Sequence, residues 1–301
     1  MKDAVYKLLG RTTAWIDGRF EVAFHGRETV EHRKGGSATD RTGLLVRPGE
    51  RLTALMRESD LLYFGYESAA QSLWRAQEFS LFHRNRALLT APLLDFGCGD
   101  GSFAAALFDS VDYGVDVDPA ALERARAYGL YRDLLQSAEV SIPLPDSAVG
   151  SIVSNSVLEH VTRLDDVLKE LRRILRKDGR LVFSVPVIAF RRQLAKWFGE
   201  AESIKVNVQY YHRNLFSPGE WRARLEAAGF EIEELRPFQP EKFTFWYRMF
   251  RLFGRKGLGR LIPDPAAKLW RVCRRGLVRM VRQSIERTTE GANIFVIARA
   301  K

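Results

Sequence analysis

The sequence predicts an α/β protein whose core is a mostly parallel β-sheet covered by helices on both faces. Short apolar runs alternate with helical patterns between Leu93 and about Phe238, which is typical of strands joined by crossover helices. The runs are nearly continuous in hydrophobicity, as expected for strands buried on both faces. A glycine-rich turn separates the first run from the helix that follows it. Hydrophobic residues make up 46% of the 301 residues, which excludes a chain without a folded core.

The individual elements follow from apolar runs, helix caps and glycine stops. The predicted strands are residues 93–96, 113–116, 151–155, 181–185, 230–235 and 293–298. One or two helices are predicted over residues 69–89, and a further helix over residues 102–107. Caps and stops delimit the other helices: Asp118-Pro119 to Gly129, residues 164–175 with an end at Gly179, and the capping box at residues 217–220 with an end at Gly229.

The glycine-rich turn indicates a nucleotide site. It reads Asp95-Phe96-Gly97-Cys98-Gly99-Asp100-Gly101, and Asp116 follows Gly97 by 19 residues at the end of the next predicted strand. That offset suits an acidic side chain that binds a ribose hydroxyl. Ser102 replaces the third glycine of the dinucleotide fingerprint, and the acidic residues that flank the turn would repel a pyrophosphate. These features favour S-adenosylmethionine, which has no phosphate and carries positive charge.

With these motifs the chain resembles the class I S-adenosylmethionine-dependent methyltransferases of the type 11-like group. The similarity rests on the turn at residues 95–101, on Gly114-Val115-Asp116, on residues 142–146 and 154–161, and on residues 175–186. It implies a Rossmann-like three-layer α/β/α sandwich with a mostly parallel seven-stranded sheet, whose last strand is antiparallel. It also implies S-adenosylmethionine as the cofactor.

The resemblance implies roles for single residues. Gly97, Gly99 and Gly101 would lie against the methionine part of the cofactor and Asp116 on its ribose, with Asn155 and Ser156 beside it. Asp95, Cys98 and Val117 complete the expected set. Two positions depart from the family pattern: Ala138-Glu139 stands where many relatives have Asp-Ala, so Glu139 takes the expected place near the adenine, and Val149-Gly150 replaces Phe-Asp.

Two of the five histidines are candidates for the general base of an O-methylation. His160 follows the fourth predicted strand of the family pattern, and His212 lies in a polar, aromatic loop after the fifth; both loops should face the ligand crevice. The Leu-Glu-His sequence recurs in relatives with different substrates, so His160 could instead be architectural. The sequence shows no metal-ligand spacing, and we therefore expect no metal.

The net charge of +10 is concentrated in an insertion predicted at about residues 239–290, before the last strand. Thirteen basic and three acidic residues lie between Pro240 and Arg287, interleaved with aromatic residues. Residues 266–287 predict a basic amphipathic helix, which is typical of a helix on an anionic membrane surface. Two alternatives stay open: a solvated arginine face on a helix that packs on the domain, and nucleic-acid binding, which we weight less.

The expected organisation is an N-terminal extension, residues 1–69, and a methyltransferase domain, residues 70–301. A β-hairpin is predicted in the extension around Asp17-Gly18. Only Cys98 and Cys273 are present, and we see neither a signal peptide nor an apolar run long enough for a transmembrane helix. We therefore expect a cytoplasmic protein, peripheral at the inner face of the plasma membrane.

The expected reaction is O-methylation of a glycan, a lipid-linked intermediate or a small molecule. The chain resembles methyltransferases encoded with bacterial surface-polysaccharide enzymes. The alternatives are an RNA methyltransferase that uses the basic insertion on phosphates, a quinone or lipid-ring methyltransferase, and a non-catalytic scaffold that binds the cofactor. The sequence does not indicate the oligomeric state.

Overall fold

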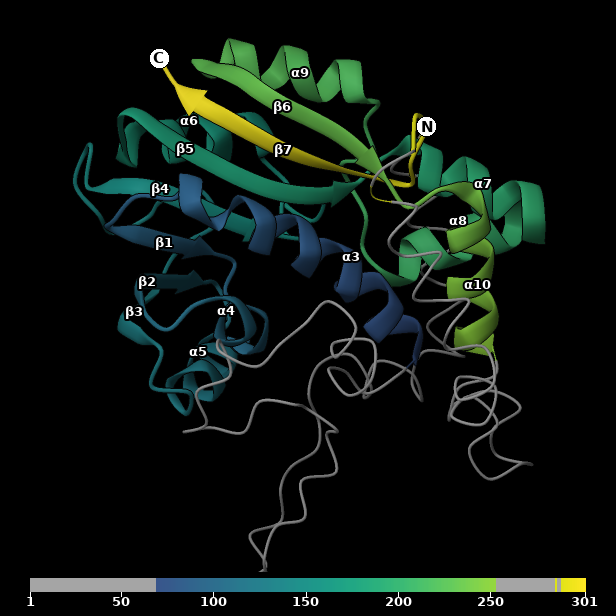
Figure 1. Ribbon diagram of the computed structural model, residues 1–301, viewed down its shortest axis with the longest axis horizontal. Coiled ribbons are helices and arrows are strands. Elements are labelled where there is room, and N and C mark those ends of the chain that lie inside the picture. The colour runs from purple at the N-terminus through teal and green to yellow at the C-terminus, as the bar shows by residue number, and fades with distance from the viewer. Residues whose placement is uncertain (1–68, 253–284, 286–287) are drawn as a thin grey trace, which may run out of the picture. The chain divides into compact units, whose positions relative to one another are not determined.

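A computed structural model describes residues 69–252, 285 and 288–301, and these residues form one sheet with helices on both faces (Figure 1). The strand order is β3-β2-β1-β4-β5-β7-β6. Strands β1 to β5 run parallel, whereas β7 is antiparallel to both of its neighbours, β5 and β6. The predicted Rossmann-like sandwich with seven strands and an antiparallel last strand is confirmed. The strands are β1 (Leu93–Phe96), β2 (Val111–Asp116), β3 (Tyr131–Gln136), β4 (Val149–Asn155), β5 (Leu175–Pro186), β6 (Phe230–Phe238) and β7 (Asn293–Ala300).

Two hydrophobic layers hold the helices on the sheet. The helices are α3 (Ala69–Asn85), α4 (Ser102–Leu107), α5 (Pro119–Arg126), α6 (Leu164–Ile174), α7 (Ile188–Phe198), α8 (Glu200–Gln209), α9 (Pro218–Ala227) and α10 (Glu241–Leu252). Val153 and Val182 point into the layer formed with α3, α4, α7 and α10. Their chain neighbours Ile152 and Leu181 point into the layer formed with α6 and α9. Successive side chains of a strand point to opposite faces, so a strand covered by helices on both faces is apolar along nearly its whole length.

The helix starts agree with the predicted caps. The Asp118 side chain accepts a hydrogen bond from the Ala120 amide (2.9 Å) at the start of α5. At the start of α9, Ser217 and Glu220 form the predicted capping box. Gly229 has φ of +90° just after α9, as expected for a glycine stop.

Two expectations about element bounds were wrong or incomplete. Helix α6 ends at Ile174 rather than at Gly179, because β5 already begins at Leu175 and contains Gly179. A Cβ on Gly179 would lie 2.8 Å from the Gly150 carbonyl oxygen of β4, so this glycine permits a close approach of two strands. Strand β3 was not among the strands read from apolar runs, because it is an edge strand in which only Tyr131, Leu134 and Leu135 are even partly buried.

The insertion leaves and re-enters the sheet at adjacent points. Phe238 at the end of β6 pairs with Asn293 at the start of β7, and the Ala292 amide donates to the Gln239 carbonyl (2.8 Å).

The first part of the insertion is α10, whose aromatic residues Phe243 and Phe250 are almost fully buried in the layer with α3. Of the alternatives left open for the insertion, packing on the domain therefore applies to these two residues. Two predicted elements lie outside the described residues: the amphipathic helix at residues 266–287 and the hairpin within residues 1–69. Of these two ranges, only Ile285 and Ala69 are described. No helix in the part of the chain described is long and apolar enough to cross a membrane.

Candidate functional site

The glycine-rich turn between β1 and α4 is shaped by three left-handed glycines. Gly97, Gly99 and Gly101 have φ of +72°, +55° and +80°. The Gly97 and Cys98 amides both donate to the Val115 carbonyl of β2, at 2.8 and 3.0 Å. A Cβ at Gly97 would meet the Val157 side chain at 2.4 Å, whereas one at Gly99 would find no atom within 4 Å. The turn is thus tightly packed below Gly97 and open above Gly99, where a ligand can approach the backbone.

Asp116 is oriented toward this turn by the backbone on both sides. Its carboxylate accepts hydrogen bonds from the Gly99 amide (2.8 Å) and from the Asp118 amide (2.9 Å), each on a different oxygen. Each oxygen keeps further acceptor capacity, so the group can also bind two hydroxyls of a ribose. The next side chain, Val117, is 57% exposed. An exposed apolar side chain beside the turn suits a flat base.

Asp95 lies beneath the turn and is almost fully buried. The Tyr131 hydroxyl donates to its carboxylate (2.7 Å). Burial raises the pKa of Asp95 to about 7, with Asp116 adding in the same direction and the Tyr131 hydrogen bond opposing it. Burial likewise raises the pKa of the Cys98 thiol, so this cysteine is not a nucleophile near neutral pH.

Helix α3 supplies residues that the sequence analysis did not single out. The Glu78 side chain is completely buried and accepts hydrogen bonds from the Ser156 hydroxyl (3.0 Å) and the Trp74 indole (3.0 Å). Arg75 pairs with Glu78 (2.7 Å) and also donates to the Ser156 hydroxyl (2.8 Å). The neighbouring Asn155 accepts from Ser184 (2.6 Å). Acidic and basic residues amid the apolar face of α3 were the signal in the sequence, because buried charges need partners.

Most predicted cofactor residues therefore gather at the carboxyl ends of β1, β2 and β4, where ligands bind in such sheets. Glu139 is held elsewhere: its carboxylate accepts hydrogen bonds from the backbone and hydroxyl of Thr162 and from the Arg163 amide, in the loop that follows β4. Whether it also meets the adenine stays a prediction, as do the ligand contacts of the other residues.

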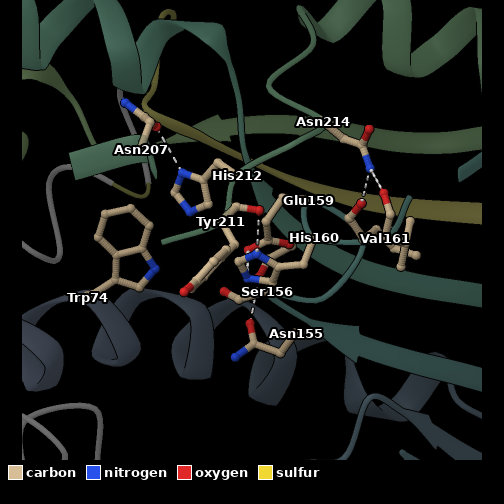
Figure 2. A network of polar contacts seen from close by, with 12 residues as sticks. Trp74, Asn155, Ser156, Glu159, His160, Val161, Asn207, Tyr211, His212 and Asn214 are labelled. Carbon is tan, nitrogen blue, oxygen red and sulfur yellow. Dashed lines mark hydrogen bonds and ion pairs between the residues drawn. The ribbon is translucent and has the colours of Figure 1, made fainter. Parts of the chain in front are cut away.

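The two candidate bases lie together although 52 positions separate them. The rings of His160 and His212 are 5.5 Å apart between centroids, and His160 Nε2 lies 3.5 Å from a carboxylate oxygen of Glu159. Figure 2 shows the three side chains converging above Asn155 and Ser156. Burial lowers the pKa of His212 to about 3, with a smaller effect of His160, and burial also lowers the pKa of His160. Burial raises the pKa of Glu159 to about 8.

An aromatic wall borders this cluster. Trp74 packs edge-to-face on Phe190 (5.2 Å between centroids), and Phe190 contacts the His212 ring (5.8 Å). The Tyr210 ring stacks on the other side of His212 (5.5 Å), and its hydroxyl bonds that of Tyr247 on α10 (2.7 Å). This aromatic wall is thus built from α3, α7, α10 and the loop after α8.

The sequence matches a family described as a methyltransferase domain over residues 66–235. An uncharacterized methyltransferase of Bacillus subtilis, YodH, is 31% identical over 161 residues, covering 51% of this chain and 66% of that protein. A probable S-adenosylmethionine-dependent methyltransferase of Mycolicibacterium smegmatis is 28% identical over 144 residues, covering 47% of this chain and 52% of the relative. The chain thus spans between about half and two thirds of the length of these relatives.

A solved structure from Thermotoga maritima, described as an S-adenosylmethionine-dependent methyltransferase and possible histamine N-methyltransferase, aligns with a TM-score of 0.45 at 19% identity. The alignment covers 77% of this chain and 98% of that one. The family match extends over more than half of the chain and includes the glycine turn, Asp116 and the β4 loop. This chain belongs to the class I S-adenosylmethionine-dependent methyltransferases.

Proposed function

We propose that the chain transfers a methyl group from S-adenosylmethionine to a hydroxyl oxygen of a small-molecule, glycan or lipid-linked acceptor. The observation that carries the proposal is the open backbone above Gly99 together with the Asp116 carboxylate fixed beside it. Nearby carboxylates favour a ligand that carries a sulfonium and an ammonium over one with a pyrophosphate. The aromatic wall and the two histidines lie on the side of the site where an acceptor would enter.

In this reaction the acceptor oxygen attacks the methyl carbon in line with the sulfur. The oxygen–carbon bond forms while the carbon–sulfur bond breaks, and its electron pair stays on the sulfur of S-adenosylhomocysteine. The hydroxyl proton must leave, and the imidazole of His160 or His212, beside the aromatic wall, can accept it. The larger contribution of the chain is alignment, because the methyl carbon is already activated by the positive sulfur.

The cofactor site is tested with Asp116→Ala and calorimetric titration of S-adenosylhomocysteine. Loss of two charge-assisted hydrogen bonds to the ribose should weaken binding by about 2–4 kcal/mol, or roughly 30- to 1000-fold. Asp133→Ala is the matched control, since Asp133 lies on the exposed edge strand β3 and pairs only with Arg132 among the contacts described. Unchanged affinity in Asp116→Ala would refute the ribose assignment.

Catalysis is tested by incubating the protein with methyl-labelled S-adenosylmethionine and separate lipid, glycan and RNA fractions of a bacterial cell. We expect label in the lipid or glycan fraction. His212→Ala should depress this turnover more than it weakens S-adenosylhomocysteine binding. Cofactor binding without label in any fraction would identify a non-catalytic scaffold instead.

The basic insertion supports a location at an anionic membrane, where each lysine or arginine contributes on the order of 1 kcal/mol. Because α10 is part of the hydrophobic core, the test deletes residues 253–284 and leaves α10 in place. The full chain should float with vesicles that contain anionic phospholipid, and the deletion should not. Flotation by both proteins would place the membrane contact elsewhere. Lipid-independent binding to RNA that weakens steeply with salt would favour the RNA alternative.

A further inference from the structure

We propose that Glu159, His160 and His212 bind a divalent transition-metal ion on the acceptor side of the site. One ligand atom from each residue lies within 4.8 Å of the other two. No metal was expected from the sequence, because the two histidines are 52 positions apart and no local spacing reveals them. Two imidazoles and one carboxylate are a ligand set that suits zinc, iron, cobalt or manganese and leaves coordination positions open.

The hydrogen bonds of both rings engage Nδ1 and leave Nε2 available to a metal. His160 Nδ1 lies 3.3 Å from the Tyr211 carbonyl oxygen, which can only accept, so Nδ1 carries the hydrogen. His212 Nδ1 lies 2.9 Å from Asn207 Oδ1. The Asn207 amide nitrogen donates to the Ser203 carbonyl (2.8 Å), which fixes its oxygen toward His212. Each histidine therefore presents an unprotonated Nε2, with its Nδ1–H held by a second residue, as metal-ligating histidines are in proteins.

One oxygen of the Glu159 carboxyl group lacks a hydrogen-bond partner within the part of the chain that the structure describes. Glu159 is 1% exposed, and its Oε2 has no hydrogen-bond partner among the described residues. A buried carboxylate oxygen without a partner is costly, and such groups are rare in folded proteins. Arg75, whose charge acts on Glu159, is paired with the buried Glu78 and does not fill this role.

The backbone fixes the two ligand-bearing segments to each other. The Arg213 and Asn214 amides both donate to the Glu159 carbonyl, at 2.8 and 3.0 Å. The Asn214 side chain then donates to the carbonyls of Leu158 and Val161, each at 2.8 Å (Figure 2). The loop after β4 and the loop after α8 are therefore held in one geometry, as a preorganised site requires.

Binding requires the ligand atoms to converge. Metal bonds of about 2.1 Å place neighbouring ligand atoms about 3.0–3.5 Å apart, so atoms that now lie up to 4.8 Å apart need to approach by up to about 1.3–1.8 Å. The His160 side chain is 40% exposed, so its ring is less confined by packing than the buried Glu159 in making this adjustment. Its exposure also leaves the open coordination positions accessible to an acceptor.

Metal binding itself does not depend on the proposed function, but the role of the ion in methyl transfer rests on that function. A metal at this place would bind an oxygen of the acceptor and lower the pKa of its hydroxyl, so that the proton passes to solvent water and the oxygen can attack the methyl carbon. The histidines would then hold the acceptor through the ion rather than take its proton themselves. An acceptor with two neighbouring oxygens, such as a diol or a hydroxy acid, suits such an ion best.

The test is metal titration of the full chain after treatment with a chelator, without S-adenosylmethionine. Co²⁺ should bind once per chain and give visible absorption bands, and Zn²⁺ should displace it in calorimetry. Glu159→Gln and His212→Gln should each weaken Zn²⁺ binding by about a hundredfold or more. Asn207→Leu removes no metal ligand but loses the side-chain hydrogen bonds to His212 and Ser203, and it should weaken binding by about 10- to 100-fold. His83→Gln on α3 is the matched control and should bind as the unaltered chain does.

S-adenosylhomocysteine affinity is measured on every variant and should stay unchanged, which shows that the fold is intact. This readout also separates the two proposals, because Asp116→Ala tests cofactor binding and the metal titration does not involve the cofactor. Failure of Co²⁺ and Zn²⁺ to bind the unaltered chain, or equal affinity in Glu159→Gln and His212→Gln, would overturn the metal site.

Discussion

The tight packing beneath Gly97 makes a quantitative prediction about the cofactor turn. In Gly97→Ala the new Cβ would lie 2.4 and 2.5 Å from the two methyl groups of Val157, and φ at this position is +72°. A left-handed backbone costs a non-glycine residue about 1–2 kcal/mol. Forcing an extra methyl group into a packed site costs about 1–3 kcal/mol more. We therefore expect Gly97→Ala to lower the free energy of unfolding by about 2–5 kcal/mol.

The two contributions can be separated with a second substitution. Val157→Ala removes both clashing methyl groups but leaves the backbone angle unchanged. In that background the nearest remaining atom is the Cβ of residue 157 at 3.0 Å, so Gly97→Ala should cost mainly the backbone part, about 1–2 kcal/mol. The coupling between the two sites should then approach about 1–3 kcal/mol. The measurement is urea unfolding of all four proteins of the cycle, followed by fluorescence.

A matched control distinguishes packing from conformation. Gly99 also has a left-handed φ, but a Cβ there meets no atom within 4 Å. Gly99→Ala should therefore cost about 1–2 kcal/mol in stability and obstruct the approach of S-adenosylhomocysteine instead. The reasoning fails if Gly97→Ala costs the same with and without Val157, or no more than Gly99→Ala.

Three further predictions concern Asp95, Ser217 and Asn214, whose side chains form hydrogen bonds that stabilise the fold or its helices. Between about pH 4 and pH 7 the unfolded chain ionises Asp95 while the folded chain keeps it protonated, so the stability that this residue contributes falls as pH rises through that window. Asp95→Asn, which keeps an acceptor for Tyr131, should gain about 2–3 kcal/mol relative to the unaltered chain between pH 5 and pH 8, and parallel stability curves would contradict the raised pKa. Ser217→Ala should lose the N-cap of α9 and about 1 kcal/mol in urea unfolding, while Ser217→Thr should lose little. Asn214→Ala leaves two buried carbonyls unpaired and should cost about 2–4 kcal/mol; a loss under about 0.5 kcal/mol would show that water replaces the amide.

Local sequence features predicted the elements whose burial or capping depends on residues close together in the sequence. Strands β1 and β4 are buried along nearly their whole length, so a continuous apolar run identified them. Strand β3 escaped because its outer edge faces solvent and Arg132 and Asp133 interrupt the apolar pattern. The end of α6 was misplaced because Gly179 permits a close strand contact, and a glycine in this role looks the same in sequence as a helix stop.

The same distinction holds for the candidate site. The glycine turn and Asp116 belong to one strand–helix–strand unit, so their spacing in sequence reflects their distance in space. Trp74 and Glu78 on α3 join the site only because α3 crosses the sheet beside β4, which no local pattern states. The convergence of Glu159 with His212 likewise depends on two loops joined by long-range backbone hydrogen bonds.

The closed base of the insertion has a consequence for how such a protein can diversify. Gln239 and Ala292 are hydrogen-bonded neighbours, so the two ends of the segment between them are held together at the sheet. Doubling the length of such a loop costs only about 0.6 kcal/mol in closure entropy. The segment that follows α10 can therefore change in length at a small cost in free energy, while the strands that carry Asp95 and Asp116 keep their register.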